Sequence, residues 1–207
     1  MTSSKDRALF FPGKQIDGFT IRKLLGQGGF GDVYLVTNSQ ENIYAMKTEY
    51  RNAPKRALSI EIEILKRLHD PCFPEFIACG ETGEVIYLVM GLYGPSIGDI
   101  RREHKNFLEG KFVFNFALKS LDVIKAFHEV GYVHRDIKPS NFLINKDQNN
   151  PLILIDFGLS KPYIDFSTGE LLPPVNGHYI GTKKYASLNA HKKRDLGRCD
   201  DLISWFY

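Results

Sequence analysis

The sequence has 207 residues, of which 43% are hydrophobic and 25% are charged, and this is ordinary usage for a globular protein with a substantial core. Its formal net charge of +3 is too small to indicate nucleic-acid binding, because such proteins usually carry a strong basic excess. The N-terminus lacks the apolar core of a signal peptide, and no later stretch reaches the about 18 apolar residues of a membrane span, so we expect a soluble protein.

The cysteines and the absence of repeats indicate the cellular compartment and the number of domains. Cys72, Cys79 and Cys199 are odd in number and form no Cys-x-x-Cys pair, which predicts reduced thiols in a cytoplasmic or nuclear protein. No internal repeat or low-complexity tract interrupts the chain, so we expect one domain or two small lobes.

A polar leader, residues 1–18, precedes the first predicted elements. Residues 19–25 alternate imperfectly like a strand and residues 32–37 are rich in β-branched and aromatic side chains, so the run Gly-Gln-Gly-Gly-Phe-Gly at 26–31 should lie at a hairpin between two strands. Dinucleotide-binding folds use the same glycine pattern but require a helix directly after it. The strand predicted there argues against a dinucleotide-dependent oxidoreductase.

Two more strands and a helix complete the predicted N-terminal part. Residues 43–47 predict the next strand, and a helix should begin near Pro54, which suits a first helical position. Asp70 and Pro71 are expected to end this helix. Residues 85–90 form an apolar run suited to a buried strand. The apolar side of the helix is predicted to consist of Leu58, Ile62, Leu65 and Leu68.

The following part of the chain is predicted to be helical and then loop-like. Residues 96–104 indicate a short helix, and residues 111–130 indicate a long one that Gly131 ends. Prolines and glycines between 156 and 187 predict a loop, in which serine and threonine are ordinary loop residues or targets of phosphorylation. The long helix should pack in the core through Phe112, Phe116, Ala117, Leu121 and Ile124.

The residues with chemical potential concentrate between 132 and 158. Tyr-Val-His-Arg-Asp-Ile-Lys-Pro-Ser-Asn-Phe at 132–142 is followed by Leu-Ile-Leu-Ile-Asp-Phe-Gly at 152–158. A carboxylate can accept the proton of a hydroxyl, a lysine can neutralise a migrating phosphoryl group, and an amide oxygen with a second carboxylate can hold Mg²⁺ on phosphates. The pattern therefore predicts phosphoryl transfer from a metal-bound nucleotide to a hydroxyl. The four groups are Asp136, Lys138, Asn141 and Asp156.

His-Arg-Asp-x-Lys-x-x-Asn followed by Asp-Phe-Gly resembles the catalytic-loop and metal-loop signature of eukaryotic protein kinases. The resemblance implies a two-lobed α+β fold, with an antiparallel β N-lobe that carries one helix and a mainly helical C-lobe, and it implies the use of ATP and Mg²⁺. It implies that Asp136 is the catalytic base and that Lys138 is the phosphate-neutralising residue of serine/threonine kinases. Asn141 and Asp156 are implied to be the metal ligands.

The same resemblance implies the nucleotide contacts. Ile-Tyr-Ala-Met-Lys at 43–47 stands where kinases carry Val-Ala-Ile-Lys, so Lys47 is expected to hold the α- and β-phosphates. Glu61 is expected to pair with Lys47, because the separation 61 − 47 = 14 fits related kinases, whereas Glu63 lies on another side of the helix. The other implied contacts are Leu25, Gly26, Gln27, Gly28, Gly29, Phe30, Gly31, Val33, Ala45, Met90, Gly91 and Tyr93.

A later segment narrows the resemblance. Residues 181–191 carry Ser-Leu-Asn where kinases usually carry Ala-Pro-Glu, and together with Gly-Pro-Ser at 94–96 they resemble the casein kinase one group. Residues 189–201 are most similar to its tau-tubulin kinase branch. The group tends to prefer protein substrates with acidic or phosphorylated residues nearby, so Lys183 and Lys184 are implied to contact a substrate anion. The alternative is a solvated basic face.

The resemblance also implies where the parts of the domain lie. A kinase domain is expected at 19–207, with the N-lobe at about 19–90, a hinge at 91–95 and the C-lobe from 96. Residues 200–207 match only the beginning of a central C-lobe helix, so the C-lobe is expected to be incomplete, with Asp201 holding the catalytic loop from below. The rival hypothesis is a catalytically inactive kinase-like module that binds nucleotide or a partner.

Overall fold

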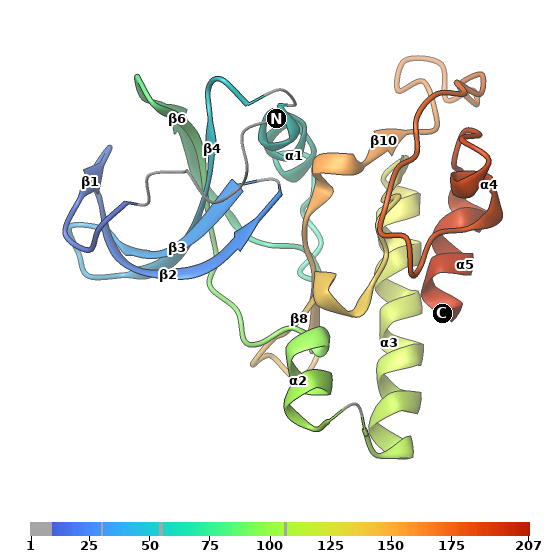
Figure 1. Cartoon of the computed structure of the whole chain (residues 1–207), viewed down its shortest axis with the longest axis horizontal. Coiled ribbons are helices and arrows are strands. Elements are labelled where there is room, and N and C mark those ends of the chain that lie inside the picture. Colours follow the sequence, from blue (N-terminus) through green and yellow to red (C-terminus); the bar gives the residue numbers. More distant parts are fainter. Residues whose placement is uncertain (1–9, 30, 54–55, 106) are drawn as a thin grey trace. The chain divides into compact units, whose positions relative to one another are not determined.

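The computed structural model describes residues 10–29, 31–53, 56–105 and 107–207 (Figure 1). They separate into two compact units. Unit 1 comprises the described residues up to Lys66 together with Glu75–Leu92, and unit 2 comprises Arg67–Pro74 and Tyr93–Tyr207. Among the described residues, no helix is long and apolar enough to cross a bilayer.

The described residues of unit 1 form a six-stranded antiparallel sheet in the order β1-β2-β3-β4-β6-β5. The strands predicted at 19–25, 32–37, 43–47 and 85–90 are all present. The sheet also contains β1, which lies inside the predicted polar leader, and β5, which the sequence patterns did not indicate. The strands are β1 (Gln15–Ile16), β2 (Phe19–Gly28), β3 (Gly31–Thr37), β4 (Ile43–Tyr50), β5 (Phe76–Glu81) and β6 (Val85–Met90).

One face of this sheet forms the core of unit 1. Tyr34 and Val36 alternate along β3 and are buried, as expected for β-branched and aromatic residues of period two. Ile16 of β1 is buried in the same cluster, so the leader contributes to the core instead of remaining outside it. The buried cluster consists of Ile16, Ile21, Tyr34, Val36, Met46, Tyr87 and Val89.

Helix α1 (Ala57–Leu65) is shorter than predicted. Pro54, where its start was expected, lies outside the described residues. The helix ends at Leu65, before the expected stop at Asp70, so Leu68 is buried beyond the helix and belongs to unit 2. The side chain of Asp70 accepts a hydrogen bond from the Cys72 N–H (3.0 Å), and this local turn competes with further helix.

The regular secondary structure of unit 2 is mainly helical, and the unit also contains two short antiparallel strand pairs, β8–β9 and β7–β10. The two helices predicted at 96–104 and 111–130 are present, and Gly131, with φ +95°, follows the long one. The predicted α+β class is thus confirmed. The elements are α2 (Ile97–Glu103), α3 (Gly110–Glu129), β7 (Tyr132–Val133), η1 (Pro139–Asn141), β8 (Phe142–Ile144), β9 (Leu152–Leu154), η2 (Phe157–Leu159), β10 (Lys161–Pro162), α4 (Leu188–His191) and α5 (Arg198–Phe206).

Helix α3 is a core helix mainly in its C-terminal half. Phe127 is fully buried and its ring lies 5.1 Å from that of Phe157 and 5.9 Å from that of Phe73. Of the predicted core positions only Ile124 is fully buried, while Phe112, Phe116, Ala117 and Leu121 are half-buried. Helix α5 lies beside α3 (Figure 1), and Trp205 Nε1 donates to Ser120 Oγ at 2.8 Å.

Candidate active site

The loop that follows β7 is held by a carboxylate from α5. Asp201 Oδ1 accepts a hydrogen bond from the Arg135 N–H at 2.8 Å, and its Oδ2 accepts one from the His134 N–H at 2.7 Å. The His128 ring of α3 also lies 2.8 Å from Oδ2. Arg135 has φ +67°, an unfavourable conformation for a residue with a side chain, and the hydrogen bonds that Asp201 accepts stabilise it. Asp201 therefore holds the loop as the resemblance implied.

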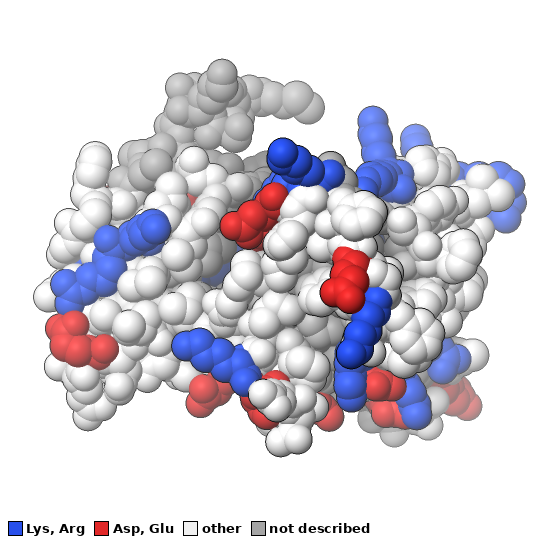
Figure 2. Space-filling view, turned by 90° about the horizontal axis from the view of Figure 1, so that it is seen from below, with Lys and Arg blue, Asp and Glu red and all other residues white. Residues whose placement is uncertain are grey.

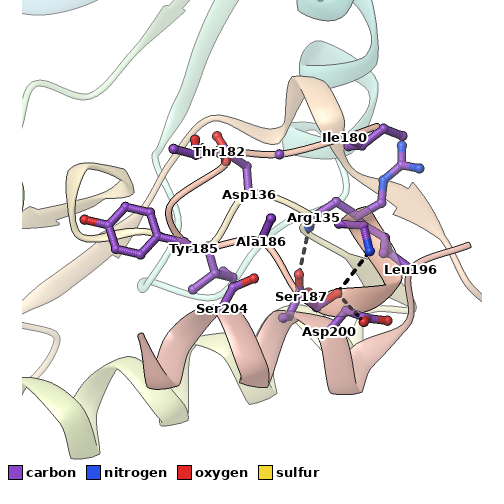
Figure 3. A pocket seen from close by; sticks show the side chains of 14 residues that line it. Arg135, Asp136, Ile180, Thr182, Tyr185, Ala186, Ser187, Leu196, Asp200 and Ser204 are labelled. Atoms are coloured by element: carbon purple, nitrogen blue, oxygen red, sulfur yellow. Dashed lines mark hydrogen bonds between the residues drawn. The ribbon is translucent and has the colours of Figure 1, made fainter. Parts of the chain in front are cut away.

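Asp136 is nearly buried on this loop, and both of its carboxylate oxygens are engaged. Lys138 Nζ donates to Oδ2 at 2.6 Å, and Thr182 Oγ1 donates to Oδ1 at 2.7 Å. Lys138 Nζ also lies 3.1 Å from Thr182 Oγ1. Figure 3 shows Thr182 beside Asp136 at a pocket that Arg135, Tyr185, Asp200 and other residues line. Lys138 and Thr182 together fix the direction of the Asp136 carboxylate.

Thr182 is a site residue to which the sequence patterns assigned no role. It lies 46 positions after Asp136, in a segment whose composition indicates only a loop. Its backbone neighbour Gly181 has φ +98°, and a Cβ there would lie 2.7 Å from the Arg135 carbonyl oxygen. The segment therefore packs directly on the catalytic loop, and only glycine fits at this point of close approach.

Asn141 and Asp156 flank the same end of the β8–β9 hairpin. Phe142 pairs with Leu154, and the Ile155 N–H donates to the Asn141 carbonyl oxygen at 3.0 Å. Asn141 Nδ2 donates to the Asp136 carbonyl oxygen at 2.9 Å, so its side-chain oxygen is the atom that could bind a cation. Asp156 has φ +72°, at the turn where the chain leaves the hairpin.

The donor set at this hairpin fits Mg²⁺ that brings phosphate ligands with it. Mg²⁺ is usually bound by one or two carboxylates, water and the phosphates of a substrate. In the part of the chain that the structure describes, no group of three or more His, Cys, Asp or Glu side chains could hold a metal ion by itself. One amide oxygen and one carboxylate are thus suited to a nucleotide-bound metal.

In unit 1, Lys47 of β4 bonds to Glu61 of α1. The distance from Lys47 Nζ to Glu61 Oε2 is 2.6 Å, and the exposed fractions of the two side chains are 9% and 4%. The side chain of Glu63, the competing residue, is 73% exposed, and its Oε1 lies 3.7 Å from Lys66 Nζ. The structure thus brings together the pair that the spacing favoured.

The glycine-rich segment closes the β2–β3 hairpin, where it was predicted. Gly28 pairs with Gly31, and Gly26 pairs with Val33. Gly31 has φ +123°, and a Cβ there would lie 2.0 Å from the Thr48 carbonyl oxygen, so β3 and β4 can pair closely only with glycine at this position. Leu25 and Gln27 are exposed on the same hairpin, and Phe30 lies outside the described residues.

The other predicted nucleotide contacts lie near the start of β4, at the end of β6 and in the residues that follow β6. Ala45 pairs with Met90, and both are buried. The Gly91 N–H already donates to the Glu75 carbonyl oxygen at 3.0 Å, so only the Gly91 carbonyl could take part in adenine recognition. Tyr93 begins the second part of unit 2, at the point where the chain leaves unit 1.

The predicted anion-contacting residues are on the surface of unit 2. Lys183 and Lys184 are exposed, and Lys184 Nζ lies 5.2 Å from the ring centre of Tyr185. Asp195, the acid within the nearby basic run, pairs with Lys161. Burial alone would raise the pKa of Asp195, but the bond with Lys161 holds that pKa below its ordinary value. The acid is thereby engaged away from the basic side chains next to it in sequence.

The family match agrees with the fold and the site. The family described as Protein kinase domain matches residues 19–202, and the chain belongs to this family. The α+β fold of unit 1 and unit 2 is therefore the protein kinase type.

The chain is similar to three curated relatives. A probable serine/threonine-protein kinase from Dictyostelium discoideum is 38% identical over 211 residues, which cover 96% of this chain and 41% of the relative. A probable casein kinase I homolog from Encephalitozoon cuniculi is 36% identical over 200 residues, 93% of this chain and 61% of the relative. A serine/threonine-protein kinase from Caenorhabditis elegans is 35% identical over 191 residues, 87% of this chain and 49% of the relative. The chain thus spans between 41% and 61% of the length of these relatives.

Proposed function

We propose that this protein is a serine/threonine protein kinase that transfers the γ-phosphate of Mg-ATP to a protein hydroxyl. The observation that carries the proposal is the nearly buried Asp136 carboxylate, which bonds to both Lys138 and Thr182. It stands on a loop that Asp201 fixes. The same loop continues into the hairpin with Asn141 and Asp156.

The Asp136 carboxylate would orient the substrate hydroxyl and accept its proton as the bond to phosphorus forms. Lys138, at 2.6 Å from Asp136, supplies positive charge next to the point where the phosphoryl group is transferred. A magnesium ion on the nucleotide would neutralise phosphate charge, with Asn141 and Asp156 as its protein ligands. The reaction thus uses positioning and electrostatic stabilisation more than covalent chemistry of the protein.

We assign the nucleotide contacts of unit 1 to the same reaction. Glu61 holds Lys47 Nζ in one position, where it would bind the α- and β-phosphates. Both partners of this buried ion pair are required, because removing either one leaves an uncompensated buried charge. The glycine hairpin would lie along the phosphates, because its backbone can approach them without side chains in the way. Ala45 and Met90 would line the adenine pocket.

Within the kinases we place the protein in the casein kinase one group, in its tau-tubulin kinase branch. The segment that departs from Ala-Pro-Glu has its own support: Ser187 Oγ donates to Asp200 Oδ1 at 2.6 Å, and Asn189 Nδ2 donates to it at 3.1 Å. The similarity to a probable casein kinase I homolog supports the group, and the assignment to the branch depends on the resemblance of residues 189–201. Exposed Lys183 and Lys184 would favour acidic or phosphorylated protein substrates.

Charge on the face of the molecule seen in Figure 2 does not by itself explain such a preference. On the face shown in Figure 2, acidic and basic side chains are interspersed and most of the surface is neutral. We therefore attribute the preference to the local basic side chains around Lys184. The preference for acidic substrates should weaken as the salt concentration rises, because salt screens exposed charges.

The test is phosphate transfer from labelled ATP to an acidic protein and, in parallel, to a neutral peptide that contains serine. We expect transfer mainly to the acidic substrate, and Asp136→Asn should reduce kcat by about 10²- to 10⁴-fold, as loss of a general base does. The matched control is Asp122→Asn, an exposed carboxylate on α3. Nucleotide binding without transfer by the unmodified chain would instead support the inactive module.

A further inference from the structure

Helix α1, which carries Glu61, has an N-terminus without a local cap. Its N-cap residue, Arg56, makes no side-chain capping bond, and the first turn contains no acidic residue. The first N–H groups of a helix have no partner within the helix and must find one elsewhere. At Leu58, which is fully buried, water cannot be that partner.

The missing cap comes from a strand. Glu49 of β4 accepts a hydrogen bond from the Leu58 N–H through Oε2 at 2.7 Å, and both residues are buried. A carboxylate at a helix N-terminus also interacts favourably with the helix dipole. Glu49 thus replaces, from a distance in sequence, the cap that the helix lacks.

Glu49 and Lys47 hold the helix at two points. The two residues are two positions apart on β4, so their side chains project from the same side of the strand. Glu49 bonds to Leu58 and Lys47 bonds to Glu61. The two attachment points on α1 are about one turn apart. A helix held at one point can pivot about it, whereas two bonds restrict both its rotation and its shift along the strand.

Burial of the Glu49 carboxyl group has a cost in free energy. Its Oε1 is buried and, among the described residues, has no hydrogen-bond partner. Burial raises the pKa of Glu49, against the bond from Leu58 and the charges of Lys47 and Arg56, which lower it. An apolar side chain would avoid the cost of burying this oxygen, but it would leave the buried Leu58 N–H without its acceptor. Such departures from local rules are expected where a residue has a functional role.

We propose that Glu49 is a positioning residue for the phosphoryl transfer proposed above. By tying the N-terminus of α1 to β4 it sets the position of Glu61, and through Glu61 it sets the position of Lys47 Nζ. This inference rests on the proposed function for its kinetic consequence, but its structural part can be tested separately.

The experiment compares Glu49→Ala, Glu49→Gln and Glu63→Ala in the full chain. Glutamine keeps an oxygen that can accept from the Leu58 N–H, and Glu63 is an exposed glutamate of the same helix. We expect Glu49→Ala to raise KM for ATP about tenfold, the size of one hydrogen bond to a charged group. Glu49→Gln should stay within about threefold of the original KM, and Glu63→Ala should not change it.

A second readout does not depend on activity. Lys47 is nearly buried in its pair with Glu61, so its amine should react slowly with an acylating reagent, as followed by mass spectrometry. Glu49→Ala should increase the labelling rate of Lys47 several-fold, with the rates of exposed lysines unchanged. Glu49→Gln and Glu63→Ala should leave it unchanged.

Two results would overturn the proposal. One is a Glu49→Ala variant whose activity falls only with its folded fraction, at unchanged KM and unchanged Lys47 labelling. The other is a Glu49→Gln variant as impaired as Glu49→Ala, which would exclude the bond to Leu58 as the cause. If the original chain transfers no phosphate while Lys47 labelling responds as expected, the proposed function fails and the positioning role of Glu49 stands.

Discussion

The Asp136 carboxylate has one direction because Lys138 and Thr182 each hold one of its oxygens. Thr182 is the more informative of the two, because its hydroxyl contacts both Asp136 and Lys138. It can therefore keep the proton acceptor and the positive charge in register before a substrate arrives.

Thr182→Ala should lower kcat by about 10- to 100-fold, the range for losing a hydrogen bond to a charged group. Thr182→Ser keeps the hydroxyl and should retain most of the activity. Steady-state kinetics at saturating ATP would measure both, and unfolding by urea would show whether either variant loses stability. Equal loss of kcat in the two variants would show that the methyl group, and not the hydroxyl, matters.

Sequence patterns predicted single residues well where partners are close along the chain. Asp136 and Lys138 belong to one motif, and Glu61 could be chosen by its spacing from Lys47. Thr182 could not be found in this way, because 46 positions separate it from Asp136 and its surroundings indicate only a loop. Glu49 was missed for a related reason, since the sequence does not show that a strand residue nine positions before Leu58 accepts the hydrogen bond of its N–H.

At the scale of elements, α2 begins with a reciprocal cap. The Asp99 N–H donates to Ser96 Oγ at 3.0 Å, and the Ser96 N–H donates to Asp99 Oδ2 at 3.1 Å. The hydrogen bond from the Ser96 hydroxyl is the main cause that lowers the pKa of Asp99 below its ordinary value of 3.8. A carboxyl whose pKa is lowered by folding stabilises the folded state above the unfolded pKa, and this stabilisation is lost as the pH falls through the folded pKa.

Ser96→Ala should therefore cost about 1 kcal/mol of unfolding free energy at pH 7, the usual value for a lost N-cap. The difference from the original chain should become smaller below about pH 4, where Asp99 is protonated in the unfolded state. Urea unfolding at pH 7 and pH 3 would measure it, with Ser96→Thr as the variant that keeps the cap. A difference of equal size at both values would contradict the role of the Asp99 charge.

Periodicity predicted the longer elements and failed where long-range contacts determine whether a strand forms or a side chain is buried. Strand β5 contains Ala78 and Gly80, which have little preference for strands, and pairing with β6 places it in the sheet. The periodicity of α3 does not show that burial is concentrated in its C-terminal half, where Ile124 and Phe127 are buried while Phe112 is only half-buried.

At the scale of the whole molecule, each unit carries a different part of the chemistry. Unit 1 contains the glycine hairpin with Lys47 and Glu61, and unit 2 contains Asp136, Asn141 and Asp156. Periodicity and composition predicted the longer elements of both units, but only the joint motif, by its resemblance to kinases, assigned these residues to one reaction.

Binding of nucleotide should stabilise the chain in a metal-dependent manner. At a concentration of 100 times its Kd, Mg-ATP should add about 2.7 kcal/mol to the unfolding free energy. A thermal shift series with ATP, with and without Mg²⁺, would measure this. Asp156→Asn should abolish most of the difference that Mg²⁺ makes, whereas the control variant Asp122→Asn should not. An unchanged magnesium effect in Asp156→Asn would remove that carboxylate from the metal site.

The two ends of the β8–β9 hairpin carry different features. Its paired strands hold Asn141 and Asp156 at one end, while the connecting residues 145–151 turn back at the other end, where the Asn145 N–H donates to the Pro151 carbonyl at 2.9 Å. Additions or deletions in this connection should leave the two proposed metal donors in place, because the cost of loop closure changes slowly with length. A peptide tag inserted at this turn should therefore leave the proposed cation site unchanged.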